Sequence, residues 1–121
     1  MKKTILFLSL LLTAMSGMAK KSEPFSKYLF VFFSNNTPEG EQIRYAISDN
    51  GFDYTSLNDG KPVVLSDTIA LTKSIRDPHI LRGEDGKTFY MVLTDMRSSL
   101  GWQSNDGLIL MKSTDLIHWQ H

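Results

Sequence analysis

Two similar segments constrain what this chain can fold into more than any other feature of its sequence; their first strands lie 61 residues apart and their second strands lie 65 residues apart. Each contains an apolar strand, a polar loop, a second strand, a serine, a turn and an aromatic residue, in that order. The first copy covers Tyr28–Ser34 and Ile43–Tyr54, and the second covers Phe89–Asp95 and Leu108–Trp119. Two unrelated hairpins that align by chance are the alternative, but the shared offset favours an internal repeat.

Five segments rich in β-branched, aromatic and other apolar residues predict strands. They are Tyr28–Phe33, Ile43–Ile47, His79–Leu81, Thr88–Leu93 and Leu108–Lys112. The first, fourth and fifth are continuous apolar runs, and such runs predict strands that are buried on both faces. Turn-forming clusters of Asn, Asp and Gly separate the segments. No amphipathic helix is expected in the mature chain, so the sequence predicts an all-β fold.

Short strands that recur at a long, fixed interval are typical of a β-propeller, in which each repeat forms one blade. We therefore expect residues 20–121 to form a partial β-propeller, with two blade-like units at about 27–66 and 75–121. Two blades cannot close a ring, and their flanks would present open sheet edges. We accordingly expect this chain to be the N-terminal part of a larger domain.

The N-terminus has the features of a secretory signal. Lys2 and Lys3 precede a short apolar run, and small residues lead up to Ala19. This arrangement predicts a signal peptide over residues 1–19 that is cleaved on export, with the mature protein periplasmic or secreted. An N-terminal membrane anchor is the alternative, but the run is short for a bilayer span. No second apolar stretch suggests membrane attachment after removal of the signal.

Charge and cysteine content exclude several classes of function. The formal net charge is zero, which provides no basic field for nucleic acid. The chain has no cysteine, so its fold must be stabilised by a packed core. No cluster of His or Cys residues indicates a metal site. A neutral or mildly polar ligand suits this balance, and neither a metal nor another cofactor is expected.

The segment Arg76-Asp77-Pro78-His79-Ile80 carries the strongest indication of chemistry. A residue before proline is disfavoured in the α region, which predicts that Asp77 is held in an extended conformation. At the inner end of a blade, its carboxylate would point into the axial cavity. The alternative is an aspartate that caps a turn.

Four motifs, in order, carry a resemblance to a known family. They are Asp77-Pro78-His79-Ile80, Glu84-Asp85-Gly86-Lys87, Phe89-Tyr90-Met91-Val92 and Ser113–Trp119. Their order resembles that of glycoside hydrolase family 43, the five-bladed propellers that include arabinanases, arabinofuranosidases and β-xylosidases. The resemblance implies an enzyme that hydrolyses O-glycosidic bonds of arabinose- or xylose-containing plant cell-wall polysaccharides. It also implies that about two of five blades are present here.

The family's inverting mechanism assigns roles to carboxyl groups. The resemblance implies that Asp77 is the general base that activates water. The triplet Arg76-Asp77-Pro78 also resembles a motif of sucrose- and fructan-cleaving propellers, which would make Asp77 an auxiliary carboxylate that stabilises the transition state or tunes the acid's pKa. The family's general acid is a glutamate of a later blade. We expect the four glutamates of this chain to be solvated: Glu23, Glu39, Glu41 and Glu84. We therefore expect the chain alone to be catalytically incomplete.

Four residues are candidates for substrate binding: Arg76, His79, Asp95 and Trp102. His79 could reach the cavity beside Asp77 or be a satisfied core or turn histidine. Asp95 ends a predicted strand, where sugar contact and a plain turn role are both open. Trp102 lies in a loop and could stack on a sugar ring or pack on the blade. A non-catalytic carbohydrate-binding propeller and a structural β-domain remain the alternative functions.

Overall fold

A computed structural model describes residues 26–121 and shows two three-stranded antiparallel sheets. The N-terminal sheet contains β1 (Tyr28–Phe32), β2 (Arg44–Ser48) and β3 (Thr55–Ser56). The C-terminal sheet contains β4 (Ile75–Arg82), β5 (Phe89–Asp95) and β6 (Gly107–Ser113). Three short 3₁₀ turns complete the secondary structure: η1 (Asn58–Gly60), η2 (Ser98–Leu100) and η3 (Trp102–Ser104).

The all-β fold predicted from the sequence is confirmed, and all five predicted strands are present. The two-residue strand β3 was not predicted, and β4 begins four residues before the expected start at His79. Within residues 26–121, no helix is long and apolar enough to cross a membrane. The predicted signal peptide, residues 1–19, lies outside the described residues.

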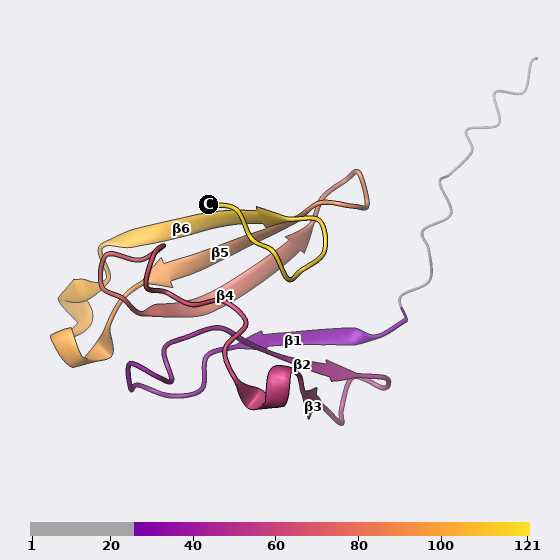
Figure 1. Ribbon diagram of the computed structural model, residues 1–121, viewed down its shortest axis with the longest axis horizontal. Coiled ribbons are helices and arrows are strands. Elements are labelled where there is room, and N and C mark those ends of the chain that lie inside the picture. The colour runs from indigo at the N-terminus through magenta and orange to yellow at the C-terminus, as the bar shows by residue number, and fades with distance from the viewer. Residues whose placement is uncertain (1–25) are drawn as a thin grey trace, which may run out of the picture.

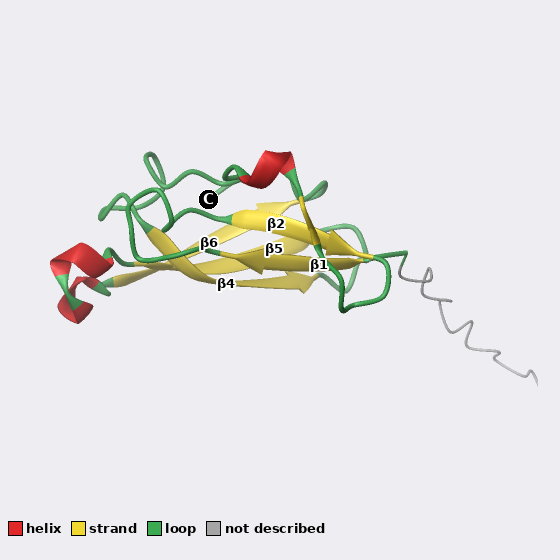
Figure 2. Cartoon of the chain, turned by 90° about the horizontal axis from the view of Figure 1, so that it is seen from below, coloured by secondary structure: helices red, strands yellow, loops and turns green. Residues whose placement is uncertain are grey.

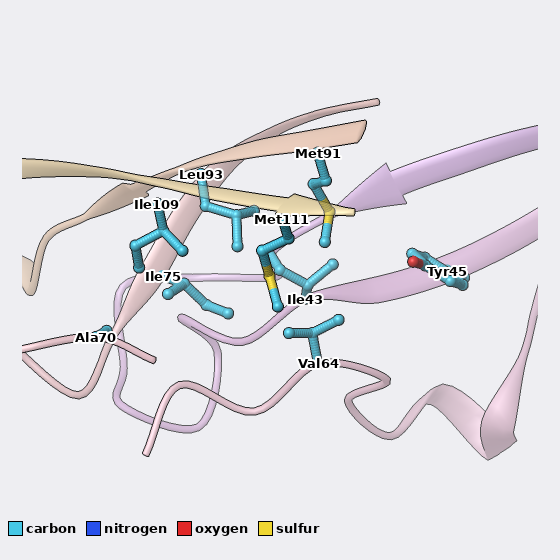
Figure 3. Packing of buried hydrophobic residues seen from close by; sticks show 9 residues of the cluster. All are labelled: Ile43, Tyr45, Val64, Ala70, Ile75, Met91, Leu93, Ile109 and Met111. Carbon is cyan, nitrogen blue, oxygen red and sulfur yellow. The ribbon is translucent and has the colours of Figure 1, made fainter. Parts of the chain in front are cut away.

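The two sheets enclose a single apolar core (Figures 1 and 3). Ile43 and Tyr45 on one side pack against a cluster from the C-terminal sheet: Ile75, Met91, Leu93, Ile109 and Met111. Burial raises the pKa of Tyr45 to about 12, and its hydroxyl accepts a hydrogen bond from Trp119 Nε1 at 3.0 Å. The core therefore lies between the sheets, and each sheet contributes one face to it.

The predicted burial of three strands on both faces is wrong for the chain described here. Tyr28 and Phe30 of β1 are 55% and 50% exposed, and Leu108 and Leu110 of β6 are also exposed. In β5 and β6, buried residues alternate with half-buried or exposed ones. The cause is that alternate side chains of a strand point to opposite faces, and the core covers only one face of these three strands.

The internal repeat is visible in the hydrogen bonds of two equivalent turns. The Ser48 hydroxyl bonds to Asn50 Oδ1 and accepts the amides of Asn50 and Gly51 at 3.2 and 2.8 Å. Asn50 Oδ1 then accepts the amides of Phe52 and Asp53. The four bonds from backbone amides cap donors that the turn would otherwise leave without a partner.

The second turn repeats this pattern 65 residues later. The Ser113 hydroxyl bonds to Asp115 Oδ1 and accepts the amides of Asp115 and Leu116 at 3.2 and 2.9 Å. The backbone also agrees, because Gly51 and its equivalent Leu116 both have left-handed φ angles, of 80° and 66°. The register agrees as well: Ile47 pairs with Thr55, and Lys112 pairs with Gln120.

The buried side chain of Glu41 joins the two sheets. Glu41 is fully buried, and its Oε1 accepts bonds from Arg76 Nη1 at 3.1 Å and from the Ser98 amide at 2.9 Å. Its carbonyl accepts the Ile75 amide at 2.9 Å. The Arg76 guanidinium also lies 4.5 Å from the centre of the Phe33 ring. Glu41, three residues before β2, is thus bound to β4 and to the loop that follows β5.

The prediction that Glu41 is solvated is therefore wrong. Burial disfavours its charge, but hydrogen bonds from Ser98 and Ser74 and the Arg76 guanidinium outweigh that effect and hold the pKa of Glu41 below its usual range. Within residues 26–121, Glu41 Oε2 and Arg76 Nε are buried without a hydrogen-bond partner. The pair is therefore buried, and its hydrogen bonding within these residues is incomplete.

Replacing Ser48 or Ser113 by alanine should destabilise the fold by similar amounts. Each loss removes one hydroxyl that serves three bonds at a buried position, which costs roughly 1–3 kcal/mol. Urea unfolding measures the difference, and Thr114→Ala, an exposed neighbour in the second turn, is the matched control. If only one of the two serine variants is destabilised, the turns are not equivalent in energy.

Glu41→Gln should lower the stability of the fold at neutral pH and make that stability less dependent on pH. Because the folded pKa of Glu41 is lowered, its contribution is present above the ordinary glutamate pKa of about 4.3 and is lost as the pH falls below it. The gap between wild type and Glu41→Gln in urea midpoint should therefore narrow from pH 7 to pH 3. The exposed Glu84, changed to Gln, should track the wild type, and a gap independent of pH would contradict the assignment.

Candidate active site

The sequence-predicted site residues gather at one end of the C-terminal sheet. At this end β4 begins, β5 finishes and β6 begins, because Ile75 pairs with Asp95 and Asp95 pairs with Gly107. The loop with η2 and η3, which carries Trp102, extends from the same end, opposite the hairpin that joins β4 to β5 (Figures 1 and 2). The topology thus brings Arg76, Asp77, Asp95 and the Trp102 loop to the same end of the sheet.

Asp77 lies in a β-bulge of β4. Arg76 pairs with Thr94 and His79 pairs with Val92, so Asp77 and Pro78 stand opposite Leu93 alone. The φ angle of Asp77 is 49°, in the left-handed region. The predicted extended conformation is therefore wrong: the proline disfavours the right-handed region, and the bulge turns the chain into the left-handed one.

This conformation has a cost and a consequence. A left-handed non-glycine residue stores roughly 1–3 kcal/mol of strain, which the surrounding structure has to offset. The bulge leaves the Asp77 side chain exposed, although its neighbours Ile75 and Arg76 are buried. Asp77 is therefore presented to solvent from a strand whose preceding residues are fixed, an arrangement that bulges near active sites often provide.

Arg76 is committed to the protein interior. It is 8% exposed, and its guanidinium is occupied by Glu41 and by the Phe33 ring, as described above. Direct contact with a substrate would require it to leave this pair. The contacts of Arg76 instead suit a role in positioning the backbone of the neighbouring Asp77.

Asp95 is also engaged by the protein. Its Oδ2 accepts the Leu71 amide at 2.7 Å, and its Oδ1 accepts the Thr72 amide and hydroxyl at 3.0 and 2.6 Å. Burial opposes ionisation, but these bonds outweigh it and hold the pKa of Asp95 below its usual range. Of the two roles that the sequence left open, this geometry favours the turn residue, which ties the segment before β4 to the end of β5.

His79 and Trp102 are both accessible. His79 pairs with Val92 and lies exposed on the face of the C-terminal sheet that points away from the core. Trp102 begins η3 and is 79% exposed. An exposed indole in a loop at the same end of the sheet as Asp77 can stack on a sugar ring, and neither His79 nor Trp102 is part of the core.

The glutamates of residues 26–121 do not provide a partner acid for Asp77. Hydrogen bonds from Ser98 and Ser74, together with Arg76, hold the pKa of Glu41 below its usual range. Glu39 Oε1 lies 3.4 Å from Arg44 Nη2, and the Glu39 side chain is exposed. Glu84 belongs to the hairpin at the far end of β4. In this part of the chain, no group of three or more His, Cys, Asp or Glu residues could hold a metal ion. What the arrangement offers chemically is the exposed carboxylate of Asp77 at this end of the sheet.

Sequence reasoning missed Glu41 as a member of this region. Its surroundings in the sequence, a polar turn before a strand, match those of an exposed residue. The partner that makes its burial possible lies 35 residues away in Arg76. An arginine directly before the Asp-Pro pair was the one available signal, because a buried arginine needs a carboxylate partner.

Comparison with known proteins indicates that this chain is part of a glycosidase-like domain. A family model described as a probable glycosyl hydrolase domain matches residues 23–121. An α-L-arabinofuranosidase of Bifidobacterium longum subsp. longum is 30% identical over 104 residues, which cover 79% of this chain and 10% of that enzyme. This chain therefore spans about a tenth of the length of that relative.

No solved structure shows a significant match to the chain. The resemblance to glycoside hydrolase family 43 that the sequence motifs predicted is nevertheless confirmed by the family match. The chain belongs to the family of probable glycosyl hydrolase domains related to glycoside hydrolase family 43.

Proposed function

We propose that this chain forms part of a glycosidase domain that hydrolyses O-glycosidic bonds of arabinose- or xylose-containing polysaccharides, with Asp77 as a catalytic carboxylate. The observation that carries the proposal is the exposed Asp77 in a strained bulge, held by buried neighbours. Backbone strain of this kind clusters at active sites. The family match and the arabinofuranosidase relative support the reaction class.

In an inverting reaction, a carboxylate draws a proton from water while a carboxylic acid on the opposite side of the sugar protonates the leaving oxygen. An exposed carboxylate suits the first role, because water and substrate can reach it. Asp77 would then be the general base. The alternative role, an auxiliary carboxylate that stabilises the transition state or tunes the acid, uses the same exposed position.

The general acid has to come from outside residues 26–121 under this proposal, because the three glutamates in that range are unsuited to it. The two sheets would be two blades of a five-bladed propeller whose other blades supply the acid and a third carboxylate. The relative supports this arrangement, since its length is about ten times the part that this chain matches. Trp102 and His79 would contact the sugar, with Arg76 in a positioning role and Asp95 holding the loop.

An exported location completes the proposal. A plant cell-wall polysaccharide is too large to enter a cell intact, so its hydrolysis requires a periplasmic or secreted enzyme. A signal peptide at residues 1–19 would deliver the protein to that compartment.

The test is hydrolysis by the product of the complete reading frame. It should release arabinose or xylose from nitrophenyl glycosides or from arabinoxylan, and proton NMR of the first product should show inversion at the anomeric carbon. Asp77→Asn should lower kcat/KM by roughly 10²–10⁴-fold, the usual contribution of an acid or base group.

Asp67→Asn is the matched control, since Asp67 is an exposed aspartate in the loop before β4. It should leave the rate unchanged. A near-normal rate for Asp77→Asn would contradict the role of Asp77. Binding of arabino- or xylo-oligosaccharides without any turnover would instead support the second candidate function, a non-catalytic carbohydrate-binding domain.

A further inference from the structure

The C-terminal sheet has a small pocket at the end where β5 finishes and β6 begins, the end that carries η2 and η3 in Figure 1. Its volume is about 210 Å³. Its walls come from this sheet, from the segment that leads into β4 and from the loop that joins β5 to β6, so the pocket does not involve the sheet faces. The side chains that line it are Leu71, Thr72, Asp95, Gln103, Ser104 and Asp106.

Asp95 holds one wall of the pocket in place. Its Oδ2 accepts the Leu71 amide at 2.7 Å, and its Oδ1 accepts the Thr72 amide and hydroxyl at 3.0 and 2.6 Å. Hydrogen bonds to a charged acceptor are stronger than those between neutral groups. The segment before β4 is therefore fixed to the end of β5, and this wall is formed before any ligand binds.

The loop that forms the other wall is also held by hydrogen bonds. The Ser104 hydroxyl accepts the Arg97 amide at 3.3 Å and lies 2.7 Å from the Gly101 carbonyl, to which it can donate. Arg97 Nε donates to Ser74 Oγ at 3.2 Å, and Ser74 is fully buried directly before β4. The two walls are thus connected through the protein, which lowers the ordering cost that a ligand has to offset on binding.

Gln103 and Asp106 bring exposed polar side chains to the pocket. A carboxylate accepts hydrogen bonds, whereas an amide both donates and accepts them. Together they match a pair of sugar hydroxyls, each of which is a donor and an acceptor. The carboxylates of Asp95 and Asp106 would repel an anion, so the pocket suits a neutral ligand that is rich in hydroxyl groups.

The size of the pocket limits its ligand to one small ring. Pockets for drug-sized ligands measure roughly 300–1,000 Å³, so a volume of about 210 Å³ suits a single pentose unit better than an oligosaccharide. Trp102 directly precedes Gln103 in the same loop, and its exposed indole offers a face on which an adjoining unit can stack.

The pocket lies away from Asp77. Asp77 belongs to β4, whereas Gly107, which also borders the pocket, begins β6 on the other side of β5. Neighbouring strands are about 4.8 Å apart, so two spacings separate these positions by roughly 10 Å. A sugar unit in the pocket is therefore a different unit from one placed against Asp77.

We propose that this pocket is a second sugar subsite, which binds one unit of the polysaccharide at a distance from the bond that is cleaved, with Gln103 and Asp106 hydrogen-bonded to its hydroxyls. The inference rests on the proposed function, because it assigns a further part of the same substrate to the same domain. The subsite favours chains of several sugar units over single glycosides.

Comparing a short and a long substrate tests the subsite in the product of the complete reading frame. Asp106→Ala and Gln103→Ala should each raise KM for an arabino- or xylo-oligosaccharide of about five units, by roughly tenfold for Asp106→Ala, because a hydrogen bond to a charged group is lost. The kcat for this substrate and the kcat/KM for a nitrophenyl monoglycoside should stay unchanged, since the pocket binds ground state and transition state equally.

Asn105→Ala is the matched control, because Asn105 is exposed in the same loop and does not line the pocket. It should behave like the wild type with both substrates. An unchanged KM for the oligosaccharide in Asp106→Ala would overturn the proposal. An equal loss of kcat/KM with both substrates would also overturn it, because that result places Asp106 in the reaction itself.

Calorimetry separates failure of the subsite from failure of the proposed function. If the wild type hydrolyses neither substrate, the glycosidase proposal fails, but binding of the oligosaccharide that Asp106→Ala weakens and Asn105→Ala does not would still support the subsite. Binding that Asp106→Ala leaves intact, or no binding at all, would overturn it. Loss of wild-type binding in EDTA would show that the carboxylates hold a cation instead, and would overturn it as well.

Discussion

The buried carboxylate of Glu41 sits where the N-terminal sheet meets β4 and the loop after β5, and it holds all three together. A buried charge is costly unless it is paired and hydrogen-bonded, so the Arg76 guanidinium and the Ser98 amide have to stay in place. This requirement fixes the first residues of β4. The exposed Asp77 follows directly, so the position of the candidate catalytic carboxylate depends on a contact made in the protein interior.

The strands and the repeat could be predicted from the sequence because they depend on local patterns. Apolar runs mark the strands, and Ser48 and Ser113 mark two turns whose hydrogen bonds involve only nearby residues. Burial on each face could not be predicted, since it depends on which sheet covers which. Glu41 was misjudged for the same reason, because its partner is distant in the sequence.

The candidate site shows the same division. The Arg-Asp-Pro triplet was recognisable, but its conformation was not, because the left-handed φ of Asp77 arises from a bulge in the pairing of β4 with β5. The sequence also could not decide between two roles for Asp95, which the amides of Leu71 and Thr72 now favour as a turn residue. Backbone geometry and distant donors, rather than residue types, set these outcomes.

The central claim is that the Glu41–Arg76 pair couples the two sheets, and a double-mutant cycle tests it most directly. Urea unfolding at pH 7 would compare the wild type with Glu41→Gln, Arg76→Gln and the double variant. Each single change leaves a charge buried without its partner. The double variant should therefore lose less free energy of unfolding than the sum of the two single losses, by about 1–3 kcal/mol. Losses that add to within about 0.5 kcal/mol would contradict the claim.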